Sequence, residues 1–218
     1  MSPQAQRLHA ALPQTQCTRC GYPDCAGYAE AMAAGAPINQ CPPGGAEGIA
    51  RLAALTGRPA VPLDPDRGLE GPRTVAVIDE HWCIGCTLCI EVCPTDAILG
   101  SNKRMHTIVE RYCTGCELCV PVCPVDCIGV ENVTGERTGW RAWSQAHADE
   151  ALARYRARRT RLARESEEHA ARLAAKAQAT LADLPAHTHG AAGGEADRKR
   201  AVIEAALARA RARQQAGG

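Results

Sequence analysis

Short apolar runs and cysteine-rich loops alternate in the middle of the chain. The runs VAVI (75–78) and TIV (107–109) each precede a cysteine loop, and further apolar residues follow each loop. Runs of this length, rich in β-branched residues, predict short strands. A shift of 30 residues superposes HWCIGCTLCIEVCPTDAI (81–98) on RYCTGCELCVPVCPVDCI (111–128), with ten of 18 positions identical. We therefore predict strand, cysteine loop, short helix and strand, twice, with pseudo-twofold symmetry.

The remaining sequence divides around this repeat. We expect an N-terminal four-cysteine module (1–50), a linker or wrapped loop rich in Pro and Gly (51–73), the repeat (74–133) and a tail (144–218). The tail contains 24 alanines among 75 residues, which predicts helix interrupted at Leu184-Pro185 and near Gly193-Gly194. Within the module, AGYAEAMAA (26–34) predicts a helix with Tyr28 and Met32 on one side, in the core. The expected fold class is α+β.

Composition shows that aromatic packing is a poor source of core for this chain. Aromatic residues make up 3% of the 218 residues and phenylalanine is absent, whereas thirteen cysteines lie between positions 17 and 127. No apolar run approaches the roughly 18 residues of a membrane span, and the N-terminus lacks a signal-peptide pattern. We therefore expect a soluble cytoplasmic protein, in which dense cysteines bind metal more often than they form disulfides.

Each copy of the repeat carries the motif C-x2-C-x2-C-x3-C-P. In this motif three thiolates surround one [4Fe-4S] cluster and the fourth ligates the other cluster. The predicted ligand sets are Cys83, Cys86, Cys89 with Cys123, and Cys113, Cys116, Cys119 with Cys93. Zinc is the alternative, but structural zinc sites usually use separated cysteine pairs. Two clusters in a bacterial 2[4Fe-4S] ferredoxin-like (βαβ)2 domain are the stronger interpretation.

Three residues near these loops carry separate expectations. Cys127 stands where the first copy has Ala97, so we predict a small buried apolar side chain rather than a ligand. Trp82 and Tyr112 occupy equivalent places before the two loops, and we expect them to shield the clusters from water.

The N-terminal module has the pattern C-x2-C-x4-C-x15-C, formed by Cys17, Cys20, Cys25 and Cys41. Spacing alone permits either zinc or a third cluster. The surrounding motifs LPQTQC, CGYP-x-C and INQCPPGG, followed by both C-P loops in the same order, are specific. Over about residues 8–133 the chain resembles RnfB, the ferredoxin-like subunit of bacterial Rnf-type electron transport complexes.

This resemblance implies a [4Fe-4S] cluster on Cys17, Cys20, Cys25 and Cys41, making three clusters in all. It also implies redox partners among the other Rnf subunits at the cytoplasmic face of the inner membrane. Two features depart from the family pattern. Members of the family usually begin with a membrane-spanning helix, whereas only 16 residues precede Cys17 here, so we do not expect direct membrane anchoring. The helical tail also lies outside the resemblance. We therefore expect a soluble form of RnfB.

Two functions remain open at this point. The first is an electron carrier without a substrate-converting site, because no nucleophile elbow, phosphate loop or dinucleotide fingerprint is present. The second is a protein with structural clusters whose basic tail binds nucleic acid or a repair or partner enzyme. The segment RYRARRTRLAR (154–164) favours the second, but Glu165, Glu167 and Glu168 follow it directly, so nucleic-acid binding is the weaker interpretation.

Net charge is distributed unevenly along the chain. Residues 1–140 carry a formal charge of −5 and residues 141–218 carry +6. Each oxidised cluster with four thiolates would add a charge of about −2. We therefore expect a strongly acidic redox body with a basic arm, and a docking partner that presents a positive face.

Overall fold

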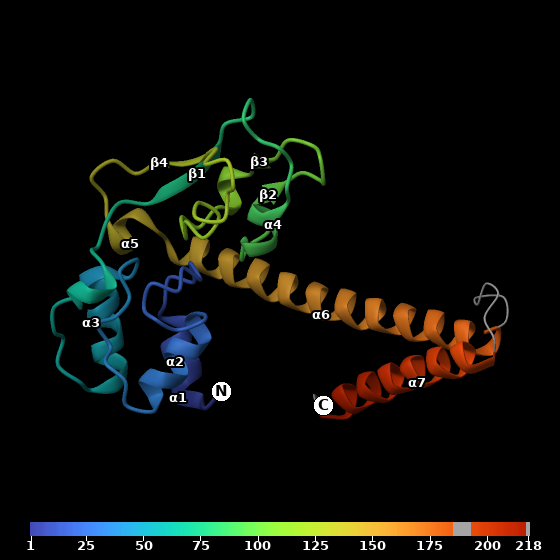
Figure 1. Ribbon diagram of the computed structural model, residues 1–218. Coiled ribbons are helices and arrows are strands. Elements are labelled where there is room, and N and C mark those ends of the chain that lie inside the picture. The colour runs from blue at the N-terminus through green and yellow to red at the C-terminus, as the bar shows by residue number, and fades with distance from the viewer. Residues whose placement is uncertain (185–192, 217–218) are drawn as a thin grey trace. The chain divides into compact units, whose positions relative to one another are not determined.

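A computed structural model describes residues 1–184 and 193–216 (Figure 1). The chain forms two compact units, Met1–Arg158 and Arg159–Gly218, and all thirteen cysteines lie in the first. The elements are α1 (Pro3–Ala10), α2 (Cys25–Ala33), α3 (Gly45–Thr56), η1 (Pro65–Arg67), β1 (Thr74–Ile78), α4 (Leu88–Val92), β2 (Ile98–Leu99), β3 (Thr107–Ile108), η2 (Glu110–Tyr112), β4 (Ile128–Asn132), α5 (Gly139–Ala142), α6 (Gln145–Ala182) and α7 (Gly193–Ala216). Helices and strands therefore both occur, as predicted.

The repeat forms two small antiparallel sheets, each with one strand from each copy. Strand β1 pairs with β4, with Thr74 opposite Asn132 and Ile78 opposite Ile128. Strand β2 pairs with β3, with Ile98 opposite Ile108. The first strand of the repeat thus lies beside the last, and the two middle strands lie together (Figure 1). This pairing brings both cysteine loops to one core.

The predicted short helix forms in only one copy. Helix α4 follows the first cysteine loop, whereas the equivalent residues 118–122 form turns. In α4 the amide of Glu91 donates to the Thr87 carbonyl at 3.1 Å. The shift of 30 residues places Pro121 at this position, and proline has no N–H to donate. The second copy therefore cannot form the same helical hydrogen bond.

Three helices build the N-terminal module. The Ser2 hydroxyl caps α1 and the Asp24 carboxylate caps α2, accepting from the Gly27 amide at 2.7 Å. Tyr28 and Met32 are buried in the module core with Leu8 and other apolar residues, as predicted. Helix α3 extends to Thr56 and so crosses the boundary predicted at residue 50. Its buried Leu52 explains this, because this residue belongs to the module core and lies within the expected linker.

Cysteines supply much of the core that aromatic residues do not. The core of the repeat combines five buried cysteines with small and β-branched side chains: Cys89, Cys93, Cys113, Cys119 and Cys127 with Val75, Ala76, Ile78, Ala97, Ile98 and Ile128. A separate cluster of Trp140, Trp143, Ala148 and Ala151 lies where α5 leads into α6. Two of the three tryptophans are therefore used outside the cysteine loops.

The first turns of α6 belong to the cysteine-containing unit, although the sequence predicts a separate tail from residue 144. The Tyr155 hydroxyl donates to the Asp24 carboxylate at 2.8 Å. The guanidinium of Arg158 pairs with Asp96 at 2.6 Å and also donates to the Glu91 carbonyl. The first turns of α6 therefore contact both the N-terminal module and the repeat.

The second unit is helical in its described part except for a turn at residues 183–184. Exposed pairs one helical turn apart, Arg161 with Glu165 at 3.3 Å and Arg164 with Glu168 at 3.7 Å, offset part of its basic charge. Helix α7 begins at Gly193, near one predicted interruption, whereas the other, at Leu184-Pro185, lies partly outside the described residues. Across residues 1–184 and 193–216, no helix is long and apolar enough to span a bilayer.

Candidate iron-sulfur sites

The four predicted ligands of the first set line one small cavity. Cys83, Cys86 and Cys89 come from the first motif, and Cys123 comes from the second. We call this cavity the Cys83 site. Cys127, His106 and apolar residues that include Ile78 and Val125 complete its lining.

The four ligands of the other predicted set line a second small cavity. Here Cys113, Cys116 and Cys119 from the second motif meet Cys93 from the first. We call this cavity the Cys113 site. The exchange of the fourth cysteine follows from the strand pairing, because each sheet joins the two copies.

Glycine and main-chain amides shape both loops alike. Gly85 and Gly115 both have φ of +68°, and a Cβ there would lie 2.5 Å from main-chain atoms of Arg104 and of Thr74, respectively. Both glycines therefore have the left-handed backbone conformation that other residues rarely adopt. The His106 amide donates to Cys83 Sγ at 3.3 Å, and the equivalent amide of Ala76 donates to Cys113 Sγ at 3.5 Å. Such donors favour negative charge on sulfur.

The four N-terminal cysteines are buried together in the module; we call them the N-terminal site. Burial, with added repulsion from Cys25, Cys17 and Cys20, raises the pKa of the Cys41 thiol well above its ordinary value. Burial likewise raises the pKa of the Cys25 thiol to about 12. Thiols bind metal as thiolates, so loading such a site releases protons and requires a strongly cationic centre.

A chain of buried glutamines supports the N-terminal site. The Gln16 side-chain carbonyl accepts from the Cys25 amide at 2.9 Å, and its amide donates to Gln14 at 3.0 Å. Gln14 donates to the His9 carbonyl. Both glutamines are 2% exposed. The motif LPQTQC is visible in the sequence, but this structural role of its glutamines is not, because their partners are set by the fold.

The arrangement fits clusters better than single metal ions. Within the described residues, no three His, Cys, Asp or Glu side chains converge closely enough to hold one ion. A zinc ion would need its four sulfurs within about 2.3 Å of one point. In each of the two repeat sites, four thiols line one cavity instead.

The other residues singled out in the loops have mixed outcomes. Cys127 is buried as predicted, but its sulfur lies 3.4 Å from that of Cys123, so it faces the site rather than merely filling space. Trp82 is 69% exposed and does not line either cavity, so its predicted shielding role is wrong. Tyr112 packs against the repeat core, with the Arg154 guanidinium 3.0 Å from its ring centroid.

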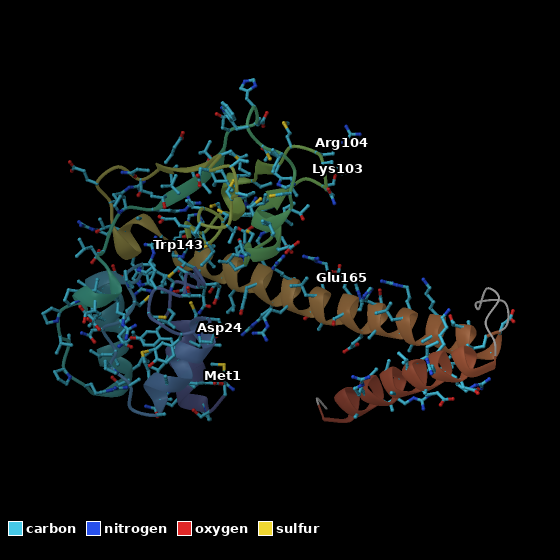
Figure 2. The ribbon with its side chains drawn as sticks, in the orientation of Figure 1. Met1, Asp24, Lys103, Arg104, Trp143 and Glu165 are labelled. Atoms are coloured by element: carbon cyan, nitrogen blue, oxygen red, sulfur yellow. The ribbon has the colours of Figure 1, made fainter. Side chains whose placement is uncertain are left out.

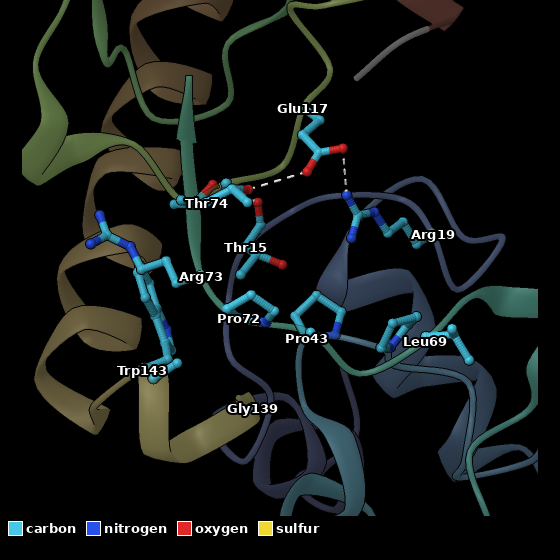
Figure 3. Close-up of a pocket in the computed structure, with 15 residues that line it drawn as sticks. Thr15, Arg19, Pro43, Leu69, Pro72, Arg73, Thr74, Glu117, Gly139 and Trp143 are labelled. Carbon is cyan, nitrogen blue, oxygen red and sulfur yellow. Dashed lines mark hydrogen bonds and ion pairs between the residues drawn. The ribbon is translucent and has the colours of Figure 1, made fainter. Parts of the chain in front are cut away.

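The N-terminal module contacts the repeat beside the Cys113 site. The Thr114 hydroxyl donates to the Thr15 carbonyl at 2.9 Å, and Arg19 pairs with Glu117 at 2.8 Å. Figure 3 shows this pair beside Thr74, whose hydroxyl donates to Glu117 at 3.2 Å. The Trp143 indole donates to the Pro13 carbonyl at 2.8 Å. The N-terminal loop is therefore joined to the second cysteine loop.

Comparisons with known proteins define the class first. Residues 76–130 match the family model for a 4Fe-4S dicluster domain. Residues 12–43 match a separate model, FeS, whose description is of an Fe-S cluster. The chain is therefore an iron–sulfur protein with a dicluster domain preceded by a second iron–sulfur module.

Curated relatives then define the family. The chain is 59% identical over 140 residues to the RnfB subunit of the ion-translocating oxidoreductase complex of Azoarcus sp. (strain BH72), covering 64% of this chain and 76% of that protein. It is 54% identical over 143 residues to the RnfB of Stutzerimonas stutzeri (strain A1501), covering 66% and 74%. The chain belongs to the RnfB family of ion-translocating oxidoreductase complex subunits, and the resemblance found in the sequence is confirmed.

Proposed function

We propose that this chain holds three [4Fe-4S] clusters and passes single electrons through them as the RnfB subunit of an Rnf-type complex. The ligands are Cys17, Cys20, Cys25 and Cys41 at the N-terminal site, and the crossed sets at the Cys83 and Cys113 sites. The observation that carries the proposal is the pair of cavities, each lined by three thiols of one motif and the fourth of the other. When bound, the clusters supply the one-electron chemistry.

The protein supplies burial, spacing and hydrogen bonds around these groups. Contacts Thr15–Thr114 and Arg19–Glu117 favour a relay in which the Cys113 site lies between the other two. The strand pairing also supports a ferredoxin-like (βαβ)2 relationship for residues 74–133, with the second helix reduced to turns.

The partners are other subunits of the complex, met at the cytoplasmic face of the inner membrane. The names of the relatives describe subunits of ion-translocating oxidoreductase complexes. The cysteine-rich part of the chain is acidic before any cluster is added, which favours docking partners with a positive face.

Anaerobic purification with metal analysis and EPR tests the proposal. We expect about twelve iron atoms per chain, the number in three [4Fe-4S] clusters, and reduced-cluster signals after dithionite addition. About eight iron atoms with one zinc would contradict the third cluster.

Paired cysteine variants test the crossed ligand sets. The Cys83→Ser/Cys123→Ser double variant removes ligands from one proposed site and should cost about four iron atoms. The Cys83→Ser/Cys93→Ser variant removes ligands from two sites and should cost about eight. The reverse result would contradict the assignment. Cys127→Ala is the matched control and should retain all iron, because Ala97 serves at the equivalent place.

A further inference from the structure

The internal repeat allows the two cavities to be compared residue by residue. Superposing the copies by 30 residues pairs His106 with Ala76 and Cys127 with Ala97. His106 and Cys127 both line the Cys83 site, whereas Ala76 and Ala97 both line the Cys113 site. The Cys83 site therefore contains two side chains that can donate hydrogen bonds. The equivalent positions of the Cys113 site hold alanines, which cannot.

The backbone makes room for the larger of these groups. Continuing the register of β2 and β3 places Gly100 opposite His106, and a Cβ at Gly100 would overlap Cδ2 of the imidazole. The equivalent pair in the other sheet is Val130 opposite Ala76. The residue opposite the bulky imidazole of His106 is therefore glycine, whereas the residue opposite the small side chain of Ala76 is valine. His106 is 1% exposed.

Both added groups contact ligand sulfurs. His106 Nδ1 lies 3.2 Å from Cys89 Sγ, and Cys127 Sγ lies 3.4 Å from Cys123 Sγ. A cluster-bound thiolate has no hydrogen and can only accept. In the loaded protein His106 and Cys127 are therefore the donors in these two contacts. The other imidazole nitrogen, Nε2, is buried without a hydrogen-bond partner among the described residues.

Polar groups at the Cys113 site do not balance this difference. Thr95 and Thr114 line it, but their hydroxyls donate to the carbonyls of Tyr112 at 2.8 Å and Thr15 at 2.9 Å. Although the Thr114 hydroxyl also lies near Cys116, its single hydrogen is engaged. Glu117 adds a carboxylate to this cavity, paired with Arg19.

We propose that His106 and Cys127 are positioning residues that give the Cys83 site a higher reduction potential than the Cys113 site. The inference rests on the proposed function. Reduction takes a cluster with four thiolates from a charge of about −2 to about −3. Donors aimed at the sulfurs stabilise the more negative state, so they raise the potential. One electron leaves the Cys113 site as one enters the Cys83 site, and no bond or proton changes place.

This difference in reduction potential sets the direction of electron flow between the two sites. Electrons supplied by a low-potential protein donor at the N-terminal site would cross the Cys113 site and collect at the Cys83 site. Loop 101–104 lies beside that site, where the Lys103 amide donates to the Gly85 carbonyl at 2.9 Å. Figure 2 shows Lys103 and Arg104 pointing outward from this loop.

The test is an EPR-monitored redox titration of the full-length, anaerobically loaded protein at fixed pH. In His106→Leu and in Cys127→Ala, we expect the higher of the two dicluster potentials to fall. In each variant the equilibrium constant for reduction of the Cys83 site should fall about tenfold, which corresponds to a decrease of 59 mV in the potential of a one-electron couple. His106→Asn should retain the wild-type potential, because its amide can donate near the Nδ1 position. Ala97→Cys should raise the other potential.

Iron content separates the possible failures. Full iron with unmoved potentials in His106→Leu and Cys127→Ala would overturn this inference and leave the cluster assignment standing. A shift in the lower potential, or the same fall in His106→Asn as in His106→Leu, would also overturn it. Wild-type protein without iron at the Cys83 site would overturn the proposed function as well. If His106→Leu does not load, Cys127→Ala and Ala97→Cys decide the result.

Discussion

The Tyr28 hydroxyl supports the segment that leads into the fourth N-terminal cysteine. It donates to the Pro37 carbonyl at 2.9 Å and accepts from the Gln40 amide at 3.0 Å, while the residue is 1% exposed. Burial raises the pKa of this hydroxyl, so it stays protonated and able to donate. Gln40 directly precedes Cys41. Tyr28→Phe therefore removes the support for that cysteine without changing the ring.

The cost comes mainly from the Gln40 amide, which is buried and loses its acceptor, whereas Pro37 is exposed and water can hydrate its carbonyl. A buried donor without a partner costs about 1–3 kcal/mol. Phenylalanine fills almost the same volume, so we expect a total cost of about 1–3 kcal/mol. At 1.4 kcal/mol per factor of ten, local opening of the N-terminal site should become about 5- to 140-fold more frequent.

Iron release to a chelator under anaerobic conditions measures this opening. In Tyr28→Phe, about four iron atoms, the content of one cluster, should leave in a fast phase while the others leave at the wild-type rate. Tyr22→Phe is the matched control: its ring stacks on Tyr28 at 5.2 Å, and its hydroxyl makes no hydrogen bond in the described part of the chain. Equal release rates from the two variants would refute the reasoning.

Three further predictions concern packing around the sites. Arg158→Met should lower the free energy of unfolding by about 1–3 kcal/mol, because the Arg158 side chain is 8% exposed and pairs with Asp96. The control is Arg164→Met at an exposed position, which should lower it by less than about 0.5 kcal/mol. Equal urea midpoints for the two variants would contradict this prediction. Gly100→Ala should destabilise the protein by about 1–3 kcal/mol, because the added methyl group overlaps His106. In a double-mutant cycle, adding His106→Ala should recover part of this loss. Additive changes in the free energy of unfolding would exclude the overlap. A chain ending at residue 164 should keep the iron content of the full protein, since residues 1–158 form one compact unit; loss of iron would show that the second unit is needed.

Much of the site could be predicted from sequence because cluster ligation is encoded locally. The spacing of Cys83, Cys86 and Cys89 is set within seven residues, and the repeat supplies a second copy to check it. The need for positive φ at Gly85 and Gly115 is equally local, because it depends on the loop's own backbone. The repeat also predicted that Cys127 is not a ligand, because the first copy has Ala97 at the equivalent position.

Other features were missed because they depend on partners distant in the chain. Trp82 and Tyr112 are equivalent in sequence, yet only Tyr112 is covered, because α6 returns and places Arg154 over its ring. The linker was misjudged at α3, whose apolar face is explained only by the module core.

The sequence by itself determined the chemistry of this protein: which thiols form each motif, the repeat that relates them, and the family to which the chain belongs. Only the tertiary structure decided what surrounds each site. The pairing of β1 with β4 and β2 with β3 brings His106 and Cys127 to one cavity and two alanines to the other. Local spacing predicts the ligands, but reduction potential depends on hydrogen bonds and burial, which nonlocal contacts create.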